Sequence, residues 1–273
     1  MKPDLQACVE RVAASLRGRL GCVVCGAGCD VWAVHHPHEP FPAASVIKVP
    51  ILLALAADVE AGRLRWDEAA PSGRADTVAG SGVMQFLSPL AYTVRDLATL
   101  MVIVSDNRAT NRLIDLLGLD RINAYLSRAG CRGTVLARPM MDLAARAGGR
   151  ENITTPQDTA DLFLRLLRGE LAAPATTAVL MEILSAQQIR DRLPAWLPHD
   201  AAAAHKTGNL PGVVNDAGIL FLRTGPVVAS VFTSDLAADA AGRLAIQEIG
   251  RAIVETGNAL LRDATQAQAD PSR

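Results

Sequence analysis

A serine and a lysine stand three residues apart at the head of a long apolar stretch. Ser45 and Lys48 belong to the run Phe41-Pro-Ala-Ala-Ser-Val-Ile-Lys-Val-Pro50, and Ile51-Leu-Leu-Ala-Leu55 continues it. On a helix, residues three apart share one face, and a helix that is apolar on all sides is a buried helix. A serine beside an amine can lose its proton to that amine and become an acylated nucleophile. The pair therefore predicts acyl-transfer chemistry, with the backbone N–H of Ser45 placed to help hold an oxyanion. An ordinary N-cap serine is the alternative.

Two short polar motifs further along the chain contain the other residues suited to this chemistry. Ser105-Asp-Asn107 falls between two expected helices, where Ser105 or Asp106 could also be a plain N-cap. Lys206-Thr-Gly208 precedes a strand-forming stretch, and a structural surface lysine is its alternative reading. Two lysines close to one serine lower each other's pKa, so one of them can be neutral and basic near pH 7.

The composition limits the kinds of partner. The chain has 273 residues, 50% of them hydrophobic, with 27 basic and 28 acidic residues and a net charge of −1. This length can bury a full core in one domain or two. The balanced charge does not suggest nucleic-acid binding, and no apolar run reaches the roughly 18–20 residues that cross a bilayer. We therefore expect a small-molecule substrate and no membrane or nucleic-acid partner; the oligomeric state is not indicated.

The N-terminal sequence bears on localisation. The chain begins with Met1 and shows no apolar signal segment. We expect a cytoplasmic protein as the sequence stands, or a secreted or periplasmic one if a signal has been removed.

Hydrophobic periodicity predicts a helix, two strands, a central helical block, three strands and a last helix. The expected strands lie at residues 20–24, 31–34, 201–206, 217–223 and 226–234. A set of strands split by helices indicates one sheet assembled from both chain ends. We therefore predict an α/β (α+β) fold in which residues of about 1–45 and 200–265 form one lobe and residues of about 46–199 a helical lobe. The cleft between the lobes is the expected pocket.

Cysteines and histidines raise the question of a metal site. The chain has five cysteines: Cys8, Cys22, Cys25, Cys29 and Cys131. Their odd number and the lack of an apolar signal segment argue against a disulfide framework. Cys22, Cys25 and Cys29 are close enough to suggest metal binding, but they lack a second half-site and the valines between them favour a strand. The run His35-His-Pro-His-Glu39 is interrupted by proline and reads as a loop. We expect neither a metal nor a cofactor.

Taken together and in this order, the motifs at residues 45–48, 105–107 and 206–208 resemble those of the class A β-lactamase and penicillin-binding protein superfamily. The resemblance covers nearly the whole chain. It implies a single β-lactamase-like catalytic domain over residues 1–273, with an antiparallel five-stranded sheet flanked by helices and a central all-α lobe. Arg-x-Met-Met-Asp from Arg138, followed by Arg-Glu-Asn-x-Thr-Thr-Pro from Arg150, resembles the branch called class A β-lactamase-related serine hydrolases.

The resemblance implies roles for the matching residues. The expected catalytic residues are Ser45 as the nucleophile, Lys48 as the amine that assists its deprotonation, Ser105 as the hydroxyl that passes a proton to the leaving nitrogen, and Lys206. The expected substrate-binding residues are Asn107 for the side-chain amide of the substrate, Thr207 together with Lys206 for its carboxylate, Gly208 for close approach of the strand, and Asn209 for a second oxyanion N–H.

The sequence also departs from the class A pattern. Class A enzymes carry a glutamate that activates the deacylating water, in a loop that corresponds to residues 138–155, and the Glu-x-x-Leu-Asn signature is missing there. Asp142 is a possible displaced equivalent, and Glu151 is expected to pin the loop. The arginine that supports the carboxylate site of the family is not evident; Asn215 and Asp216 lie near its place, and an acid there would disfavour a carboxylate unless Lys206 neutralises it.

Three functional readings follow. The first is a serine hydrolase that opens a β-lactam through an acyl-enzyme on Ser45. The second is a cytoplasmic amidase, peptidase or esterase with the same chemistry and another substrate. The third is a penicillin-binding or sensor protein that acylates without efficient deacylation.

Overall fold

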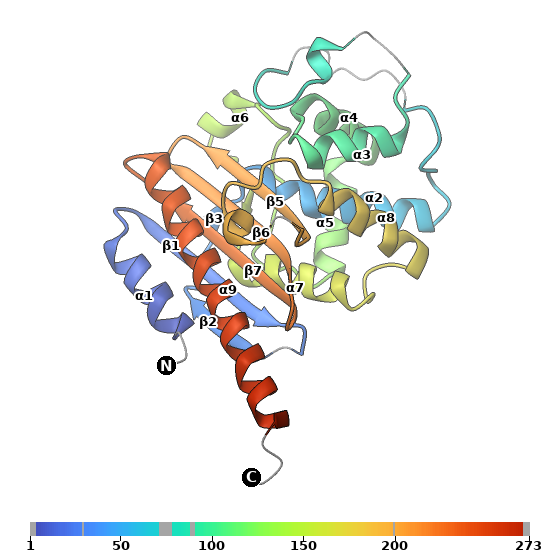
Figure 1. The fold of residues 1–273 in the computed structure, drawn as a ribbon. Coiled ribbons are helices and arrows are strands. Elements are labelled where there is room, and N and C mark those ends of the chain that lie inside the picture. The colour runs from blue at the N-terminus through green and yellow to red at the C-terminus, as the bar shows by residue number, and fades with distance from the viewer. Residues whose placement is uncertain (1–3, 29, 71–77, 88–90, 199, 270–273) are drawn as a thin grey trace.

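Strands from the two ends of the chain pair into one five-stranded antiparallel sheet, as predicted (Figure 1). The computed structural model describes residues 4–269 except 29, 71–77, 88–90 and 199. The sheet has the order β2-β1-β7-β6-β5, with β1 Arg19–Gly26, β2 Val31–His35, β5 Ala203–Leu210, β6 Val213–Leu222 and β7 Gly225–Ser234. Since β5 is at the edge of the sheet, one side of its backbone is not covered by a neighbouring strand.

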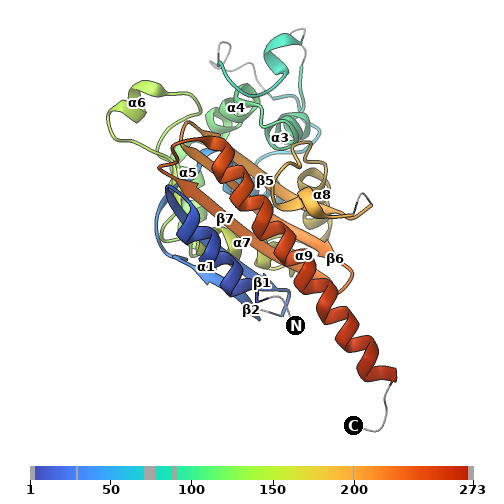
Figure 2. The same cartoon turned by 60° about the vertical axis from the view of Figure 1, so that its left-hand side comes forward.

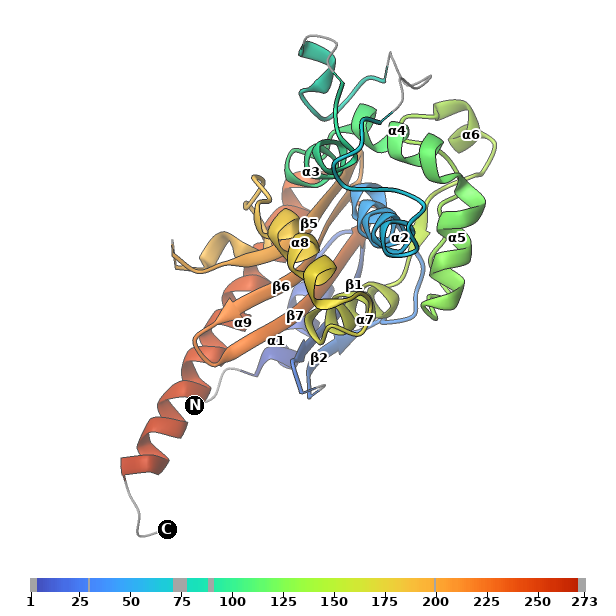
Figure 3. The ribbon, with the colours of Figure 1, turned by 90° about the vertical axis from the view of Figure 1, so that its right-hand side faces the viewer.

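Helices cover both faces of this sheet. The helices of the described residues are α1 Leu5–Ser15, α2 Lys48–Glu60, α3 Val94–Ile103, α4 Asn107–Leu117, α5 Leu119–Arg128, α6 Leu143–Ala147, α7 Pro156–Leu167, α8 Pro174–Ser185 and α9 Asp239–Ala269. The first and last helices lie side by side on one face, as Figures 1 and 2 show. α7 and α8 lie on the opposite face, and α2 to α5 form a cluster beyond them (Figure 3).

Two hydrophobic cores fill the two faces of the sheet. In β1, Cys22 and Val24 belong to the core beneath α1 and α9, whereas Val23 and Cys25 belong to the larger core around α2. This alternation follows from the period of two in a β-strand. It also means that Cys22 and Cys25 point to opposite faces and cannot bind one metal ion together. Cys29, the third residue of the suggested cluster, lies outside the described residues.

Capping residues fix the starts of two helices that the sequence predicts. The Thr93 hydroxyl accepts a hydrogen bond from the Asp96 N–H at 3.1 Å, and the Asp96 carboxylate accepts one from the Thr93 N–H at 2.9 Å. This reciprocal pair is a capping box and starts α3. Thr155 caps α7 in the same position, with Pro156 as the first helical residue.

The segment at residues 138–152 lies in the loop expected at residues 138–155 and is ordered in part as a helix. It contains the five-residue helix α6. Asp142 is the N-cap of this helix, and its carboxylate accepts a hydrogen bond from the Ala145 N–H at 2.9 Å. The helix is too short to show a hydrophobic period, which is why the sequence pattern did not reveal it.

In the part of the chain that the structure describes, none of the helices combines the length and the apolar character needed to span a bilayer.

Candidate active site

The nucleophile candidate lies in a tight turn that leads directly into the buried helix α2. Ser45 belongs to a 3₁₀ turn at residues 44–47, and Lys48 is the first residue of α2. Ala44, just before the serine, has φ +47°, a left-handed conformation that non-glycine residues adopt at a cost and that clusters at functional sites. Since α2 is buried along most of its length, Lys48 is fully buried although it is a lysine. The sequence thus places an amine inside the protein, one turn from a serine.

Lys48 is held by the second motif. Its Nζ donates hydrogen bonds to the Ser105 carbonyl at 2.7 Å and to Asn107 Oδ1 at 2.9 Å, and lies 3.1 Å from Ser105 Oγ. The first two partners are pure acceptors and can take both protons of a neutral amine. A lone pair then remains on Nζ to receive a hydroxyl proton. This arrangement suits a base rather than a structural cation.

Ser105 is held in place at the junction of α3 and α4. Its φ is +56°, and Asp106 directly after it is the N-cap of α4. The Asp106 carboxylate accepts hydrogen bonds from Ala109 N–H at 2.9 Å and from Val83 and Met84 N–H, both at 2.7 Å. The capping role of Asp106 and the chemical role expected for Ser105 therefore do not compete, because adjacent residues perform them.

The third motif reaches the same hydroxyl from the edge strand. Lys206, fully buried on β5, has its Nζ 3.1 Å from Ser105 Oγ and donates a hydrogen bond to the Thr207 carbonyl at 2.9 Å. Ser105 Oγ thus lies between two lysine Nζ atoms at equal distances. Residues that are about 60 and 100 positions apart in the chain meet at one oxygen atom, which excludes a surface role for Lys206.

Burial lowers the pKa of both lysines, and neighbouring charges modify each value. Burial, followed by the charge of Lys206, lowers the pKa of Lys48 well below its usual value, although Asp106 opposes this change. Burial lowers the pKa of Lys206 to about 7; the carboxylate of Asp216 raises it, and the guanidinium of Arg192 lowers it. At neutral pH, Lys48 is therefore the better base, and Lys206 retains part of its positive charge.

Gly208 allows the edge strand to approach the serine. A Cβ atom at this position would lie 3.1 Å from the Ser45 backbone nitrogen and 3.0 Å from the Ala44 Cβ. Any side chain here would crowd the Ser45 N–H, which is expected to stabilise an oxyanion. The expectation that glycine is needed here for close approach agrees with this geometry.

A cavity of about 260 Å³ opens beside these motifs. It is lined by residues of the first two motifs, of the end of β5, of the loop at residues 80–81 and of the segment at residues 138–152. The lining residues include Ser45, Asn107, Asn209, Met140, Arg146 and Glu151. The structure therefore brings the candidate nucleophile, the amide side chain and the second oxyanion candidate to one space.

The structure separates the two candidate acids of the loop. Asp142 does not line the cavity and is engaged as the cap of α6. Glu151 lines the cavity but is held by two arginines: its Oε1 accepts from Arg138 Nη2 at 2.5 Å and its Oε2 lies 2.9 Å from Arg146 Nε. These contacts are those expected of a residue that pins the loop. Neither carboxylate is free to activate a water beside Ser45.

Met140 occupies the inner wall of the loop instead of a carboxylate. Its N–H donates to Asn111 Oδ1 at 2.7 Å, and its carbonyl accepts from Asn111 Nδ2 at 3.0 Å. This two-way clasp fixes the backbone of Met140, whose side chain is buried at the cavity wall. The sequence pattern does not predict this clasp, because it joins positions 29 residues apart.

Arg192 supplies a cation that the sequence analysis did not find. It lies before a 3₁₀ turn (η3) at residues 193–196, is only 3% exposed, and donates to the Gly208 carbonyl at 3.1 Å and the Asn215 carbonyl at 2.8 Å. It also donates to Asn209 Oδ1. The guanidinium therefore supports the end of β5. It comes from the segment before η3 and not from the neighbourhood of Asn215 and Asp216, where the family arginine was expected.

The acid that was expected to disfavour a carboxylate has another role. Asp216 is fully buried; its Oδ1 lies 2.8 Å from His205 Nδ1, and its Oδ2 accepts from the Leu193 N–H at 3.1 Å. Its charge raises the pKa values of both Lys206 and Arg192. Asp216 thus favours the protonated form of Lys206, the residue that was expected to neutralise an acid at this place.

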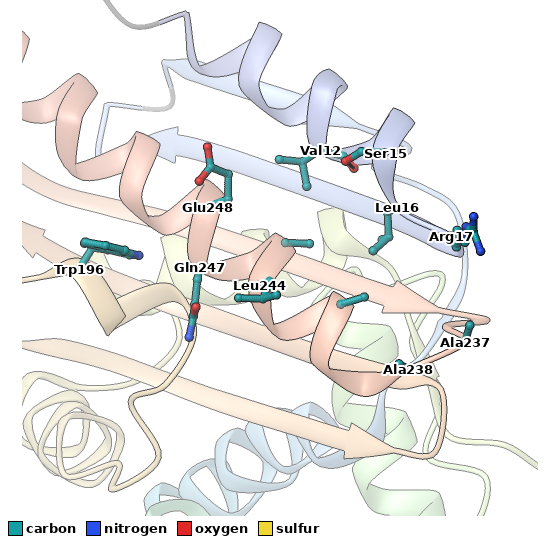
Figure 4. Close-up of a pocket in the computed structure, with 12 residues that line it drawn as sticks. Val12, Ser15, Leu16, Arg17, Trp196, Ala237, Ala238, Leu244, Gln247 and Glu248 are labelled. Carbon is teal, nitrogen blue, oxygen red and sulfur yellow. Dashed lines mark hydrogen bonds between the residues drawn. The ribbon is translucent and has the colours of Figure 1, made fainter.

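A larger hollow of about 680 Å³ lies on the far side of the sheet, between α1 and α9 (Figure 4). Its wall is mostly apolar, with Leu16, Leu244 and Trp196 among the side chains that border it. No residue of the three motifs lines it. Size alone does not make it the reactive site, since the nucleophile and both buried lysines face the other side of the sheet.

The chain belongs to the β-lactamase enzyme family, whose model matches residues 4–256. A β-lactamase of Rhodobacter capsulatus is 29% identical to it over 256 residues, which cover 90% of this chain and 86% of that protein. The crystal structure of a β-lactamase from Sphaerobacter thermophilus DSM 20745 superimposes with a TM-score of 0.86 at 33% identity, covering 94% of this chain and 97% of that one. PBP-A superimposes with a TM-score of 0.84 at 30% identity, covering 94% and 96%. The family and fold predicted from the three motifs are confirmed.

Proposed function

We propose that the protein is a serine hydrolase that opens the cyclic amide of β-lactams through an acyl-enzyme on Ser45. The observation that carries this proposal is the position of Ser105 Oγ, 3.1 Å from the Nζ atoms of both Lys48 and Lys206. A path for a proton thus runs from the amine near the nucleophile to the place where a leaving nitrogen would be. Membership of the β-lactamase enzyme family supports the same reaction.

Acylation begins with the transfer of the Ser45 hydroxyl proton to neutral Lys48. Ser45 Oγ attacks the lactam carbonyl carbon, and the oxyanion that forms is stabilised by the N–H groups of Ser45 and Asn209. The C–N bond then breaks. The proton passes from Lys48 through the Ser105 hydroxyl to the departing nitrogen, so that the Lys48 amine is neutral again. Lys206 and Thr207 bind the substrate carboxylate, and Asn107 binds the side-chain amide.

Deacylation is the slower half of the reaction. Water must attack the Ser45 ester, and the carboxylates at residues 142 and 151 are engaged in capping and ion pairing. Lys48 is the remaining base beside the ester. Met140, which lines the cavity where a carboxylate would be useful, supports a second candidate function: a penicillin-binding protein or sensor whose acyl-enzyme persists.

The test of the proposed reaction is the variant Ser45→Ala. Hydrolysis of a chromogenic cephalosporin should fall to background, while circular dichroism and thermal unfolding stay as in the wild type, because the Ser45 hydroxyl forms no hydrogen bond with the residues that the structure describes. Undiminished turnover by Ser45→Ala would rule out the acyl-enzyme.

A further inference from the structure

The cavity has a net positive charge at the end away from the lysines. Two guanidiniums, those of Arg138 and Arg146, line its loop side, and Glu151 is the one carboxylate among the described lining residues. Glu151 bridges both arginines, with one oxygen bound to each. A single carboxylate cannot neutralise two guanidiniums, so one positive charge remains.

The uncompensated charge is accessible on Arg146. The Arg138 side chain is 6% exposed, and it donates further to the Pro139 carbonyl at 3.2 Å. The Arg146 side chain is 36% exposed and binds Glu151 through Nε, 2.9 Å from Oε2. Within the described residues, the two terminal nitrogens of Arg146 form no hydrogen bond or ion pair with the protein. They are the donors in this cluster that a ligand could use.

The acyl side chain of a substrate should extend toward these donors. If Asn107 binds the side-chain amide, the group beyond the amide enters the space between Asn107 and α6. The Gly80 Cα borders this space; a Cβ there would lie 2.8 Å from Asn107 Nδ2 and 3.4 Å from Met141 Sδ. Met140 and Leu143 add apolar surface, and Arg146 is the cation beyond them.

We propose that Arg146 is a specificity-determining residue that selects substrates with an anionic group on the acyl side chain. This inference rests on the proposed function and extends it to the substrate class: a molecule with one carboxylate for Lys206 and a second anionic group for Arg146. Glu151 contributes by fixing the Nε side of the guanidinium, which directs its terminal nitrogens away from the ion pair.

The experiment uses three penicillins that differ at one carbon of the side chain: benzylpenicillin, its α-carboxy derivative carbenicillin and its α-amino derivative ampicillin. For each penicillin, the acylation rate constant is divided by the dissociation constant of the initial complex. This ratio is measured for the wild type, for Arg146→Gln and for Arg150→Gln. Arg150 is an exposed arginine of the same loop that does not line the cavity, so its variant is the matched control.

We expect the wild type to favour carbenicillin over ampicillin by about fivefold, the upper end of the range for a partly exposed ion pair. Arg146→Gln should abolish this preference and keep the rate for benzylpenicillin, and Arg150→Gln should retain the preference. Higher salt should weaken it. Loss of all three rates in parallel in Arg146→Gln would show a loop effect and would overturn the inference.

The failures of the two proposals are distinguishable. Equal rates for the three penicillins on the wild type, with Ser45 acylated by each, would overturn the role of Arg146 and leave the proposed function standing. If no penicillin acylates Ser45, the proposed function fails, and the substrate class inferred from Arg146 fails with it.

Discussion

At the scale of single residues, the site is organised around one hydroxyl with a lysine on either side. Ser105 Oγ lies 3.1 Å from Nζ of Lys48 and 3.1 Å from Nζ of Lys206. The two amines differ in their surroundings: two pure acceptors hold Lys48, whereas Lys206 is close enough to Asp216 to feel its charge. One lysine can therefore act as a base while the other binds an anion, although both are fully buried.

The titration of Lys206 should appear in substrate binding. Its pKa of about 7 means that the protonated form predominates below pH 7 and is lost as the pH rises. For penicillins that carry a free carboxylate, KM should therefore increase about tenfold between pH 6 and pH 8, with a smaller change in kcat. Steady-state kinetics across this range will measure the effect. The methyl ester of the same penicillin lacks the anion and should show no such increase; an equal increase for the ester would contradict the assignment.

Met140 should limit deacylation because it places a thioether at the cavity wall where a base is needed. Met140→Glu introduces a carboxylate on a backbone that Asn111 holds from both sides. Hydrolysis of the acyl-enzyme should accelerate by about 10²-fold or more, the usual range for general-base catalysis. The lifetime of the adduct after removal of free penicillin measures this rate. Met140→Gln has a similar size and no base, so a comparable acceleration in that variant would refute the explanation.

At the scale of elements, the edge strand β5 depends on contacts from behind. Asp216 on β6 lies beside His205, accepts a hydrogen bond from the first residue of η3, and raises the pKa values of Arg192 and Lys206. α9 secures η3 in turn, because Gly250 packs so closely that a Cβ there would lie 2.5 Å from the Leu193 carbonyl oxygen. The position of the third motif is therefore set by elements on the far side of the sheet.

Removal of this buried anion should destabilise the fold. Asp216→Asn leaves Arg192 and His205 without their charged partner, and breaking a buried charge pair from one side costs about 3–5 kcal/mol. The free energy of unfolding in urea should fall by this amount. Asp67→Asn is the control, since its side chain is 80% exposed and the change should cost less than about 0.5 kcal/mol. A loss below about 1 kcal/mol in Asp216→Asn would contradict the importance of the pair.

Elements with strong local signals could be predicted from the sequence, and those that depend on tertiary contacts could not. The caps at Thr93 and Thr155 mark helix starts directly, because the capping hydrogen bonds join residues three apart. The three motifs are short and appear in a recognisable order. The contacts of Arg192 and the clasp of Met140 were not predicted, because their hydrogen bonds join residues that are 16 or more positions apart in the sequence.

At the scale of the whole molecule, the reactive cavity exists only when both ends of the chain have paired. Strands β1 and β2 come from the first part of the chain and β5 to β7 from the last, and the segment that contains Ser45, Lys48 and Ser105 lies between them in sequence (Figure 1). The pairing of β1 with β7 closes the sheet across more than 200 residues. Lys206 can reach Ser105 only in this arrangement, so folding of the sheet and assembly of the site are one event.

The two buried lysines make the stability of the whole molecule depend on pH. Both have lower pKa values in the folded protein than in the unfolded chain, so the unfolded state binds more protons. The contribution of these lysines to the free energy of unfolding should therefore increase as the pH rises from about 7 toward the unfolded lysine pKa near 10.4. Urea unfolding at pH 7, 8 and 9 will measure this, and Lys206→Met should reduce the slope. Equal slopes in the two proteins would contradict the buried neutral amine.

The most direct test of the account is the mass of the intact protein after mixing with benzylpenicillin, followed over time and mapped by proteolysis. We predict one adduct with the mass of the whole penicillin, located on the peptide that contains Ser45, which forms quickly and clears slowly. Ser45→Ala should remain unmodified. A folded wild-type protein that never acquires an adduct while the penicillin is hydrolysed, or an adduct on any other residue, would contradict acylation of Ser45.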